Sequence, residues 1–298
     1  MNAGRFAPSP SGDLHLGNLR TALLAWLFAR SSGRDLLIRI EDLDLARVRP
    51  GAVEQQLTDL AALGLDWTGP VLTQSDRRDL YARVIDELTA AGETFECFCT
   101  RKEIAQAPSA PHAPPGAYPG TCRDLTPAER AHRRRDRPPA LRLRARAGSF
   151  TVHDALHGEY TGDVDDFVLR RGDGTPAYNL AVVVDDAATG VDQVVRGDDL
   201  LSSAPRQAYL AQLLGYPIPE YAHVPMVVNA DGVRLSKRDG AITLTQLADK
   251  GVDAAAVLSS MAVSLRLADP GASVTAADLL ERFDPAALPR EPWIFTAP

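Results

Sequence analysis

The segment FAPSPSGDLHLGNLRTALLAWLFAR, residues Phe6–Arg30, decides how the beginning of the chain folds. A short strand is predicted at Gly4–Ala7, and the prolines and glycine after it exclude regular structure. Apolar residues then recur at the helical period, which predicts a helix over residues 16–31. A glycine-bearing turn at a helix start offers unpaired backbone N–H groups to a phosphate. The turn around His15 therefore predicts either a phosphate site or an ordinary strand-to-helix junction with a histidine at its rim.

The composition is that of a globular protein with two or three domains. The chain has 298 residues, of which 45% are hydrophobic and 24% charged. No apolar run approaches the roughly 18 residues of a membrane span, and no signal pattern opens the chain, so we expect a cytoplasmic protein without membrane contact. The net charge of −7 excludes a nucleic-acid binder held by overall charge.

Strands and helices alternate in two parts of the chain. The predicted strands lie at residues 4–7, 36–40, 191–196 and 223–228. The predicted helices lie at residues 16–31, 52–64, 76–91 and 204–214. This alternation predicts an α/β fold, a Rossmann-like doubly wound parallel sheet. Ligands of such sheets bind beyond the carboxyl ends of the strands, where His15, Glu41 and Arg196 stand.

The region between these two parts interrupts the alternation. It holds all three cysteines and, from Arg123 to Arg146, nine arginines against three acidic residues. This basic segment could meet a phosphate backbone or form a solvated helix. We therefore expect four segments: the two halves of the sheet domain at residues 1–92 and 161–240, an insertion at 93–160, and a helical C-terminal region at 241–298.

The cysteines are Cys97, Cys99 and Cys122. Three cysteines are too few for a disulfide scaffold, and their clustering indicates a metal site. Three free buried thiols are the alternative.

A second glycine-flanked segment, GVRLSKRDG at residues 232–240, suits a loop that neutralises a polyphosphate, although basic loops are often only solvated. Together, His15–Asn18 (HLGN) and Arg234–Arg238 (RLSKR) resemble the HIGH and KMSKS signatures of class I aminoacyl-tRNA synthetases. The stretches RFAPSPSG, RIEDLD, AYNLAVVVDD and VVRGDDLLSSAPRQ resemble the glutamate and glutamine branch. The resemblance covers roughly residues 4–245.

The resemblance implies activation of an amino acid by ATP, in which a carboxylate attacks the α-phosphorus and pyrophosphate leaves. Catalysis is then mostly positioning and electrostatics. The implied catalytic residues are His15, Gly17, Asn18 and Lys237. Of these, His15, Gly17 and Lys237 are implied to bind ATP, with Mg²⁺ on its phosphates.

The resemblance also implies a site for L-glutamate. Arg5 and Arg196 are its candidate readers of the side-chain carboxylate, and Glu41 would pair with the α-ammonium group. The pocket would be completed by Phe6, Ala7, Pro8, Ser9 and Tyr178. Two arginines favour glutamate over neutral glutamine. The alternatives are a Glu41 paired with Arg39 or Arg47, and a Tyr178 packed in the core.

For the cysteines, the resemblance implies structural zinc. Glutamyl enzymes with zinc tend to carry Cys-x-His at the second pair, where this chain has Cys122-Arg123-Asp124. Tyr118, four residues before Cys122, instead resembles the short glutamyl-queuosine tRNA(Asp) synthetases, so we expect Cys97, Cys99, Tyr118 and Cys122 as ligands. His112 or Asp124 could replace Tyr118 as the fourth ligand.

The short family is also favoured by the end of the chain, some 60 residues after Lys237, which leads us to expect no anticodon-binding domain. The family activates glutamate without tRNA and attaches it to queuosine, the modified wobble base of tRNA(Asp). The arginine-rich insertion would hold the anticodon arm, and we expect a monomer. Two alternatives remain: a truncated glutamyl-tRNA synthetase that charges a 3′ end, and a non-catalytic RNA-binding relative.

Overall fold

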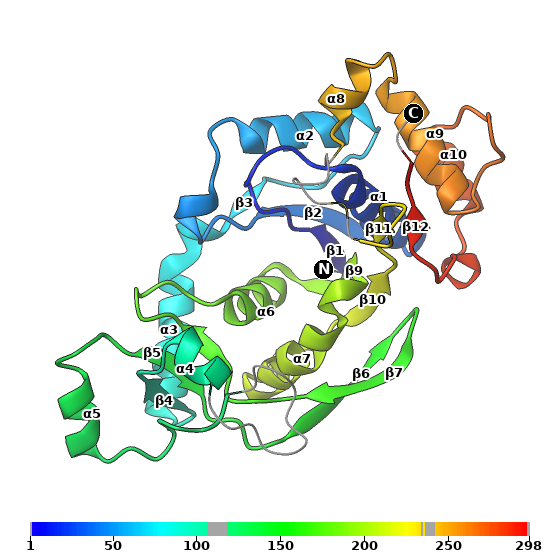
Figure 1. The fold of residues 1–298 in the computed structure, drawn as a ribbon. Helices are drawn as coiled ribbons and strands as arrows, with labels where there is room; N and C mark the ends of the chain where they lie inside the picture. Colours follow the sequence, from blue (N-terminus) through cyan, green and yellow to red (C-terminus); the bar gives the residue numbers. More distant parts are fainter. Residues whose placement is uncertain (1, 107–117, 234, 236–241, 297–298) are drawn as a thin grey trace.

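The computed structural model describes residues 2–106, 118–233, 235 and 242–296. A seven-stranded sheet in the order β3-β2-β1-β9-β10-β6-β7 forms its centre (Figure 1). The strands are β1 (Ala3–Phe6), β2 (Asp35–Ile40), β3 (Leu72–Thr73), β6 (Ser149–Asp154), β7 (Gly158–Asp163), β9 (Val191–Gly197) and β10 (Glu220–Val224). Neighbouring strands run parallel except β6 and β7. The predicted α/β fold with a mostly parallel sheet is confirmed.

The first strand and helix lie almost where the sequence predicts them. Helix α1 spans Leu16–Ser31, as expected, and β1 begins and ends one residue earlier than predicted. His15 caps α1: the backbone N–H of Asn18 donates to His15 Nδ1 at 3.4 Å, and Asn18 Oδ1 accepts from the backbone N–H of His15 at 3.4 Å. This reciprocal cap satisfies two N–H groups that a helix start otherwise leaves unpaired.

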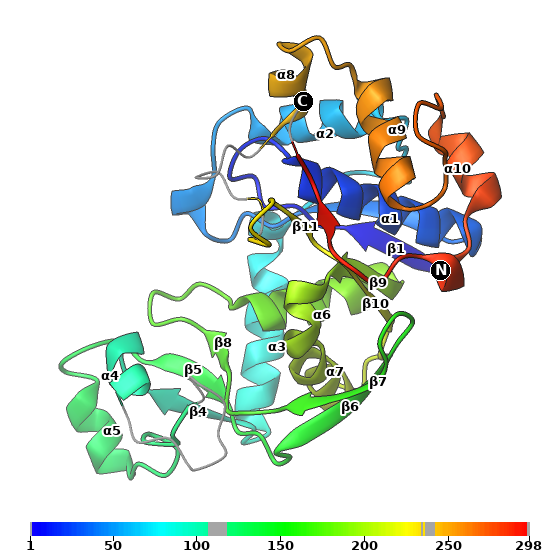
Figure 2. The same ribbon diagram turned by 45° about the vertical axis from the view of Figure 1, so that its right-hand side comes forward.

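Helices cover both faces of the sheet (Figures 1 and 2). Helix α1 covers one face, and α6 (Tyr178–Thr189) and α7 (Ala204–Leu213) cover the other. Helix α2 (Ala52–Ala62) joins the apolar cluster of α1, and α3 (Arg78–Ala90) packs against α6. Alternation along β9 shows the two faces: Val195 belongs to the apolar cluster of α1, and Val194 to a cluster that includes Ala204 and Ala208 of α7. The helix predicted at residues 76–91 is shorter in the structure: its first two residues belong to a 3₁₀ helix at Gln74–Arg77, and α3 ends at Ala90.

The predicted boundary between the insertion and the second half of the sheet domain, at residue 160, does not match the strand pairing. Strands β4 (Thr94–Cys97), β5 (Ala140–Leu143) and β8 (Val168–Arg170) form a separate antiparallel sheet. Helices α4 (Arg101–Gln106) and α5 (Pro127–Arg133) lie beside it (Figure 2). The β6–β7 hairpin instead joins the main sheet through β10. The small sheet therefore takes β8 from beyond the predicted insertion and gives up the hairpin within it.

The single strand predicted at residues 223–228 is two strands in the structure. Pro225 has no N–H to donate, and the run divides into β10 and a short β11 (Val227–Val228). β11 pairs with β12 (Trp293–Ile294) rather than with the main sheet. The described C-terminal region contains three short helices, as expected of a helical region, but its end adds a strand. Its helices are α8 (Leu244–Ala248), α9 (Ala254–Ser264) and α10 (Ala276–Arg282).

The C-terminal region packs against α1. Buried Arg20 of α1 donates to the carbonyl of Pro225 at 2.8 Å and to Ser264 Oγ of α9 at 3.1 Å. Residues Met261 and Leu279 share the apolar cluster of α1. No helix in the described part of the chain is both long and apolar enough to cross a membrane.

Asp185 of α6 ties the sheet domain to α3. Its fully buried carboxylate accepts from Gln74 Nε2 at 2.9 Å, Arg77 Nε at 2.6 Å and Tyr81 Oη at 2.8 Å. A buried carboxylate that holds three donors leaves them unsatisfied when it is removed.

We expect Asp185→Ala to lower the free energy of unfolding by about 3–5 kcal/mol, because the buried Gln74 and Tyr81 and the half-buried Arg77 lose their acceptor. Asp86→Ala, at an exposed position of α3, is the control and should change it by less than about 0.5 kcal/mol. Urea unfolding measures both. Equal small losses in the two variants would contradict this role for Asp185.

Candidate active site

A cavity of about 710 Å³ lies at the carboxyl ends of β1, β2 and β9. β1 lies between β2 and β9, so the cavity sits where the order of the parallel strands reverses direction. Eleven of the twelve predicted site residues border it: Arg5, Phe6, Ala7, Pro8, Ser9, His15, Gly17, Asn18, Glu41, Tyr178 and Arg196. The twelfth, Lys237, lies outside the described residues.

His15 and Gly17 form the end of the cavity at the start of α1. Because His15 Nδ1 accepts from the N–H of Asn18, the neutral ring carries its proton on Nε2. That N–H is a donor suited to a phosphoryl oxygen. Gly17 is packed against this ring: a Cβ added there would lie 3.1 Å from both Cε1 and Nδ1 of His15. Glycine therefore preserves the position of the histidine.

Described residues lie on either side of the part of the second signature that the structure does not describe. Leu235 is buried and borders the cavity, and its N–H donates to the carbonyl of Val227 at 3.3 Å. On the other side, the carbonyl of Ile242 accepts from the N–H of Leu16 at 2.9 Å, and Thr243 forms a β-bridge with His15. The described residues at 235 and 242–243 thus lie close to the first signature.

Buried charged side chains stand on β1 and β2, whose carboxyl ends border the cavity. Arg5 and Arg39 are buried, and both contact Asp186 of α6, through Arg5 Nε at 3.4 Å and Arg39 NH1 at 2.5 Å. Burial favours the neutral form of Asp186, but Arg39 and Arg5 hold the pKa of this carboxyl below its usual range. Asp186 therefore stays charged and balances the cations of β1 and β2.

Arg196 of β9 has a different environment, although it is only 5% exposed. Its guanidinium contacts His223 Nε2 at 3.0 Å and Gln207 Oε1 at 2.7 Å. Longer contacts reach the Tyr178 hydroxyl at 3.5 Å and the carbonyl of Leu200 at 3.4 Å. None of these four acceptors is a carboxylate. A buried guanidinium with such partners favours an anionic ligand.

Glu41 follows β2 and has a largely buried side chain. Burial raises the pKa of Glu41, while Arg39 and Arg5 oppose the shift. The alternative of an ion pair with Arg39 is present, at 3.1 Å from NH2 to Oε1. Glu41 nevertheless borders the cavity, so the ion pair orients the carboxylate at the site.

Tyr178 opens helix α6 at the edge of the cavity. It is 40% exposed, so the alternative that it packs in the core is wrong. Among the cavity residues that the sequence analysis did not assign are Arg47, Asp199, Leu200 and Met226. The motif VVRGDD placed Asp199 at a strand end, but Met226 carries no comparable local signal.

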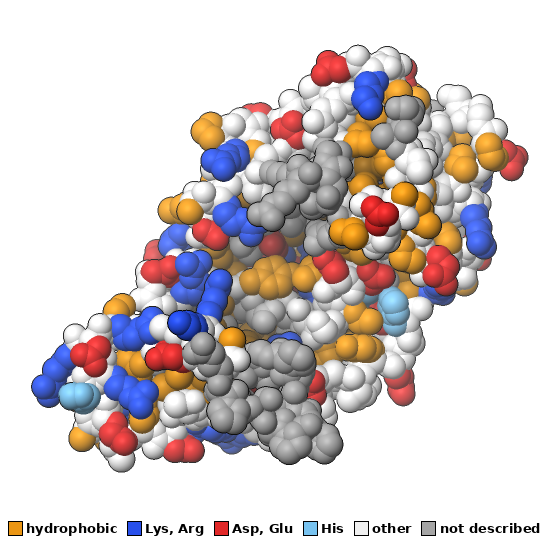
Figure 3. Space-filling view, viewed as in Figure 1, with side chains coloured by type: hydrophobic (Ala, Val, Ile, Leu, Met, Phe, Trp, Pro, Cys, Tyr) orange, Lys and Arg blue, Asp and Glu red, His pale blue; other side chains and the backbone are white. Residues whose placement is uncertain are grey.

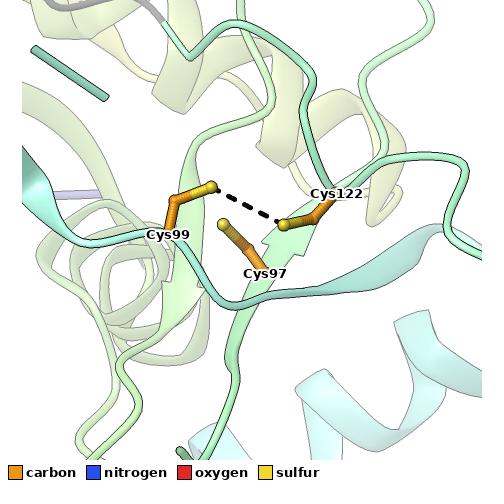
Figure 4. A group of neighbouring side chains, drawn as sticks. All are labelled: Cys97, Cys99 and Cys122. Carbon is orange, nitrogen blue, oxygen red and sulfur yellow. Dashed lines mark hydrogen bonds between the residues drawn. The ribbon is translucent and has the colours of Figure 1, made fainter. Parts of the chain in front are cut away.

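The three cysteines meet at one point in the small sheet. Their Sγ atoms lie within 4.8 Å of one another, and those of Cys99 and Cys122 are 3.6 Å apart (Figure 4). The Tyr118 hydroxyl lies 3.5 Å from Cys97 Sγ and accepts from the N–H of Cys122 at 2.7 Å. This cluster could bind a metal ion. Of the other candidate ligands, Asp124 is exposed and paired with Arg144, and His112 lies outside the described residues.

Most arginines of the basic segment have structural partners. Arg123 pairs with Asp166, Arg134 with Glu96 and Arg146 with Glu93. Arg142 is buried, with its guanidinium 3.9 Å above the ring of Tyr118. Figure 3 accordingly shows basic and acidic side chains interspersed over the lobe that contains α4 and α5. On the face shown in Figure 3, acidic side chains therefore interrupt the local excess of positive charge.

Comparisons with known proteins identify the family of this chain. A family model for the catalytic domain of class I tRNA synthetases (E and Q) matches residues 3–296. A glutamyl-Q tRNA(Asp) synthetase of Nocardia farcinica is 65% identical, over 99% of this chain and 93% of that protein. Another, of Deinococcus radiodurans, is 47% identical over 88% of each chain. A glutamate tRNA ligase structure from Elizabethkingia meningosepticum, in complex with its amino acid, has 27% identity and a TM-score of 0.82, over 100% of this chain and 67% of that one.

The chain therefore belongs to the class I tRNA synthetases of the glutamate and glutamine branch. Within this branch its relatives at 47% and 65% identity are glutamyl-Q tRNA(Asp) synthetases, which confirms the resemblance to that group.

Gly17→Ala tests the position of His15. The new Cβ would press on the ring at 3.1 Å, so we expect ATP–pyrophosphate exchange to slow by about 10- to 100-fold. Gly148→Ala is the control, because its Cβ meets no atom within 4 Å. Thermal unfolding should be similar for both variants. Exchange at the wild-type rate in Gly17→Ala would show that this contact does not matter.

Proposed function

We propose that this protein activates L-glutamate with ATP, without tRNA, and transfers the glutamate to queuosine at the wobble position of tRNA(Asp). The observation that carries the activation step is the buried Arg196, whose described partners are not carboxylates, in the same cavity as the turn of His15. One end of this cavity suits a phosphate and the other a carboxylate. A side-chain carboxylate of glutamate would supply the missing negative charge.

In this proposal, Arg196 and Arg5 bind the side-chain carboxylate, and Glu41 binds the α-ammonium group. The α-carboxylate attacks the α-phosphorus of ATP, and the bond to pyrophosphate breaks. His15 Nε2–H donates to the phosphoryl oxygen as negative charge develops there. Lys237 would neutralise the leaving pyrophosphate, and Mg²⁺ bound with ATP would supply further positive charge there. Phe6, Ala7, Pro8, Ser9, Gly17, Asn18 and Tyr178 shape the site.

Support for the acceptor comes from the relatives. The proteins with 65% and 47% identity are named for glutamyl-Q and tRNA(Asp), and this chain spans 93% and 88% of their lengths. A glutamyl-tRNA synthetase that charges a 3′ end is the second candidate, favoured by the solved glutamate tRNA ligase. That ligase is only 27% identical to this chain, against 65% and 47% for the glutamyl-Q tRNA(Asp) synthetases. With a tRNA substrate, the protein would act in the cytoplasm.

Transfer of labelled glutamate to two tRNA pools, one containing queuosine and one lacking it, tests the acceptor. We expect label only on the queuosine pool, because the nucleophile is a hydroxyl of the modified base. Equal label on both pools would mean charging of a 3′ end. Adenylate formation without transfer to either pool would also contradict the proposal.

The cysteine cluster fits structural zinc. Zn–S bonds of about 2.3 Å in a tetrahedron place sulfur atoms about 3.8 Å apart, close to the 3.6 Å between Cys99 and Cys122. We infer that Cys97, Cys99, Cys122 and the Tyr118 oxygen would hold Zn²⁺ and join β4 to the turn at Cys122. The exposed Arg135 and Arg137, close after α5, are then candidates to contact the anticodon arm.

Metal analysis tests this ligand set. Cys122→Ser should lower the zinc content from about one ion per chain to near zero, because the other ligands cannot complete the tetrahedron. Tyr118→Phe keeps the ring beneath Arg142 and removes only the hydroxyl, so it should retain zinc that a chelator removes more readily. Chelator resistance equal to that of the wild type would exclude Tyr118 as a ligand.

A further inference from the structure

The environment of Arg196 extends to a residue that the sequence analysis did not identify. In the parallel pair β9–β10, His223 is the register partner of Arg196, so both side chains lie on the face covered by α6 and α7. Arg196 Nε and His223 Nε2 are 3.0 Å apart. His223 is fully buried and lies behind the arginine, outside the residues that border the cavity.

The partners of His223 determine which ring nitrogen carries the proton. Nε–H of Arg196 can only donate, so His223 Nε2 must accept. His223 Nδ1 lies 2.6 Å from Asp154 Oδ2, and an ionised carboxylate only accepts, so Nδ1 carries the proton. Burial lowers the pKa of His223 and Arg196 adds to this shift, whereas the hydrogen bond that the ring donates to Asp154 opposes it. A neutral ring protonated on Nδ1 satisfies all three groups.

Asp154, at the end of β6, is held as firmly as the histidine. Its Oδ2 accepts from the backbone N–H of His223 at 3.0 Å, besides the ring. Its Oδ1 accepts from the N–H groups of Leu156 and His157, at 2.9 and 3.0 Å. Backbone donors thus fix the carboxylate, the carboxylate fixes the imidazole, and the imidazole fixes Nε of Arg196.

The contacts of Arg196 differ between its two sides. The short ones, to His223 and Gln207, are made with buried residues behind the guanidinium. The long ones, 3.5 Å to Tyr178 and 3.4 Å to Leu200, are made with residues that border the cavity. N–H groups on the cavity side therefore remain available for a carboxylate, in the plane that the buried contacts set.

We propose that His223 and Asp154 are positioning residues that orient Arg196 toward the side-chain carboxylate of glutamate. The inference rests on the proposed activation of glutamate, since it assigns the ligand of Arg196. Neither residue reaches the cavity, so neither is a catalytic residue. A neutral acceptor at Nε2 keeps the guanidinium in place without adding a second charge, so the positive charge of Arg196 remains for the ligand.

Two substitutions of His223 separate its two hydrogen bonds. His223→Asn places an amide near Nδ1 and can still donate to Asp154, but it has no atom at the position of Nε2. His223→Gln places an amide oxygen near Nε2 and can still accept from Arg196. His223→Asn therefore removes the contact with Arg196, and His223→Gln keeps it.

We expect His223→Asn to raise KM for glutamate by about 10- to 100-fold in ATP–pyrophosphate exchange, because a hydrogen bond to a charged group is lost. KM for ATP should stay within about twofold of the wild type, and His223→Gln should recover most of the glutamate KM. Michaelis constants do not depend on the concentration of folded enzyme, so a lower yield of a variant leaves the comparison intact.

An unchanged glutamate KM in His223→Asn would overturn the inference, and so would equal rises in KM for glutamate and for ATP. A wild-type protein without glutamate-dependent exchange would instead contradict the proposed function. Nitrogen-15 NMR of the wild-type imidazole is an independent measurement. It should show His223 neutral and protonated on Nδ1 at neutral pH; a signal for Nε2–H or for imidazolium would contradict the account.

Discussion

The structure depends on a set of buried charges at the carboxyl ends of the central strands. Burying a guanidinium is costly unless a carboxylate or several acceptors compensate it. Two consecutive aspartates of α6 provide this compensation, each mainly for a different set of side chains. Asp186 faces Arg5 and Arg39 of the sheet, and Asp185 faces Arg77 and Tyr81. Helix α6 thus joins the sheet, α3 and the amino-acid end of the cavity.

Within this set Arg196 has a distinct role. Arg5 and Arg39 share a carboxylate of the protein, whereas the described partners of Arg196 are a histidine nitrogen and three uncharged oxygen atoms. The protein therefore carries a buried positive charge whose natural partner is a ligand carboxylate. The same arrangement disfavours a neutral amide, which cannot balance the guanidinium.

Much of the fold and site could be predicted because their signals are local. The turn around His15, the period of α1 and the alternation of strands and helices follow from neighbouring residues, and they place the signature residues at the strand ends. The separation of β10 from β11 could also have been predicted, because Pro225 cannot donate a hydrogen bond within a sheet. The apolar run at residues 223–228 instead led to the prediction of one continuous strand. The path of the β6–β7 hairpin could not be predicted, because strand pairing far along the chain carries no local pattern.

The residues missed at the site have the same explanation. His223 lies in an ordinary buried strand, and only the register of β9 with β10 brings it against Arg196. Asp154 reaches His223 through the pairing of β6 with β10. The sequence shows a histidine and an aspartate some 70 residues apart, with no spacing that indicates contact.

The central claim is that a buried guanidinium whose described hydrogen-bond partners include no carboxylate selects glutamate in the absence of RNA. ATP–pyrophosphate exchange by the purified protein, with glutamate or glutamine and without tRNA, tests it most directly. We predict that glutamate supports exchange and that kcat/KM for glutamine is lower by about 100-fold or more. Equal exchange with both amino acids, or exchange that requires tRNA, would contradict the account.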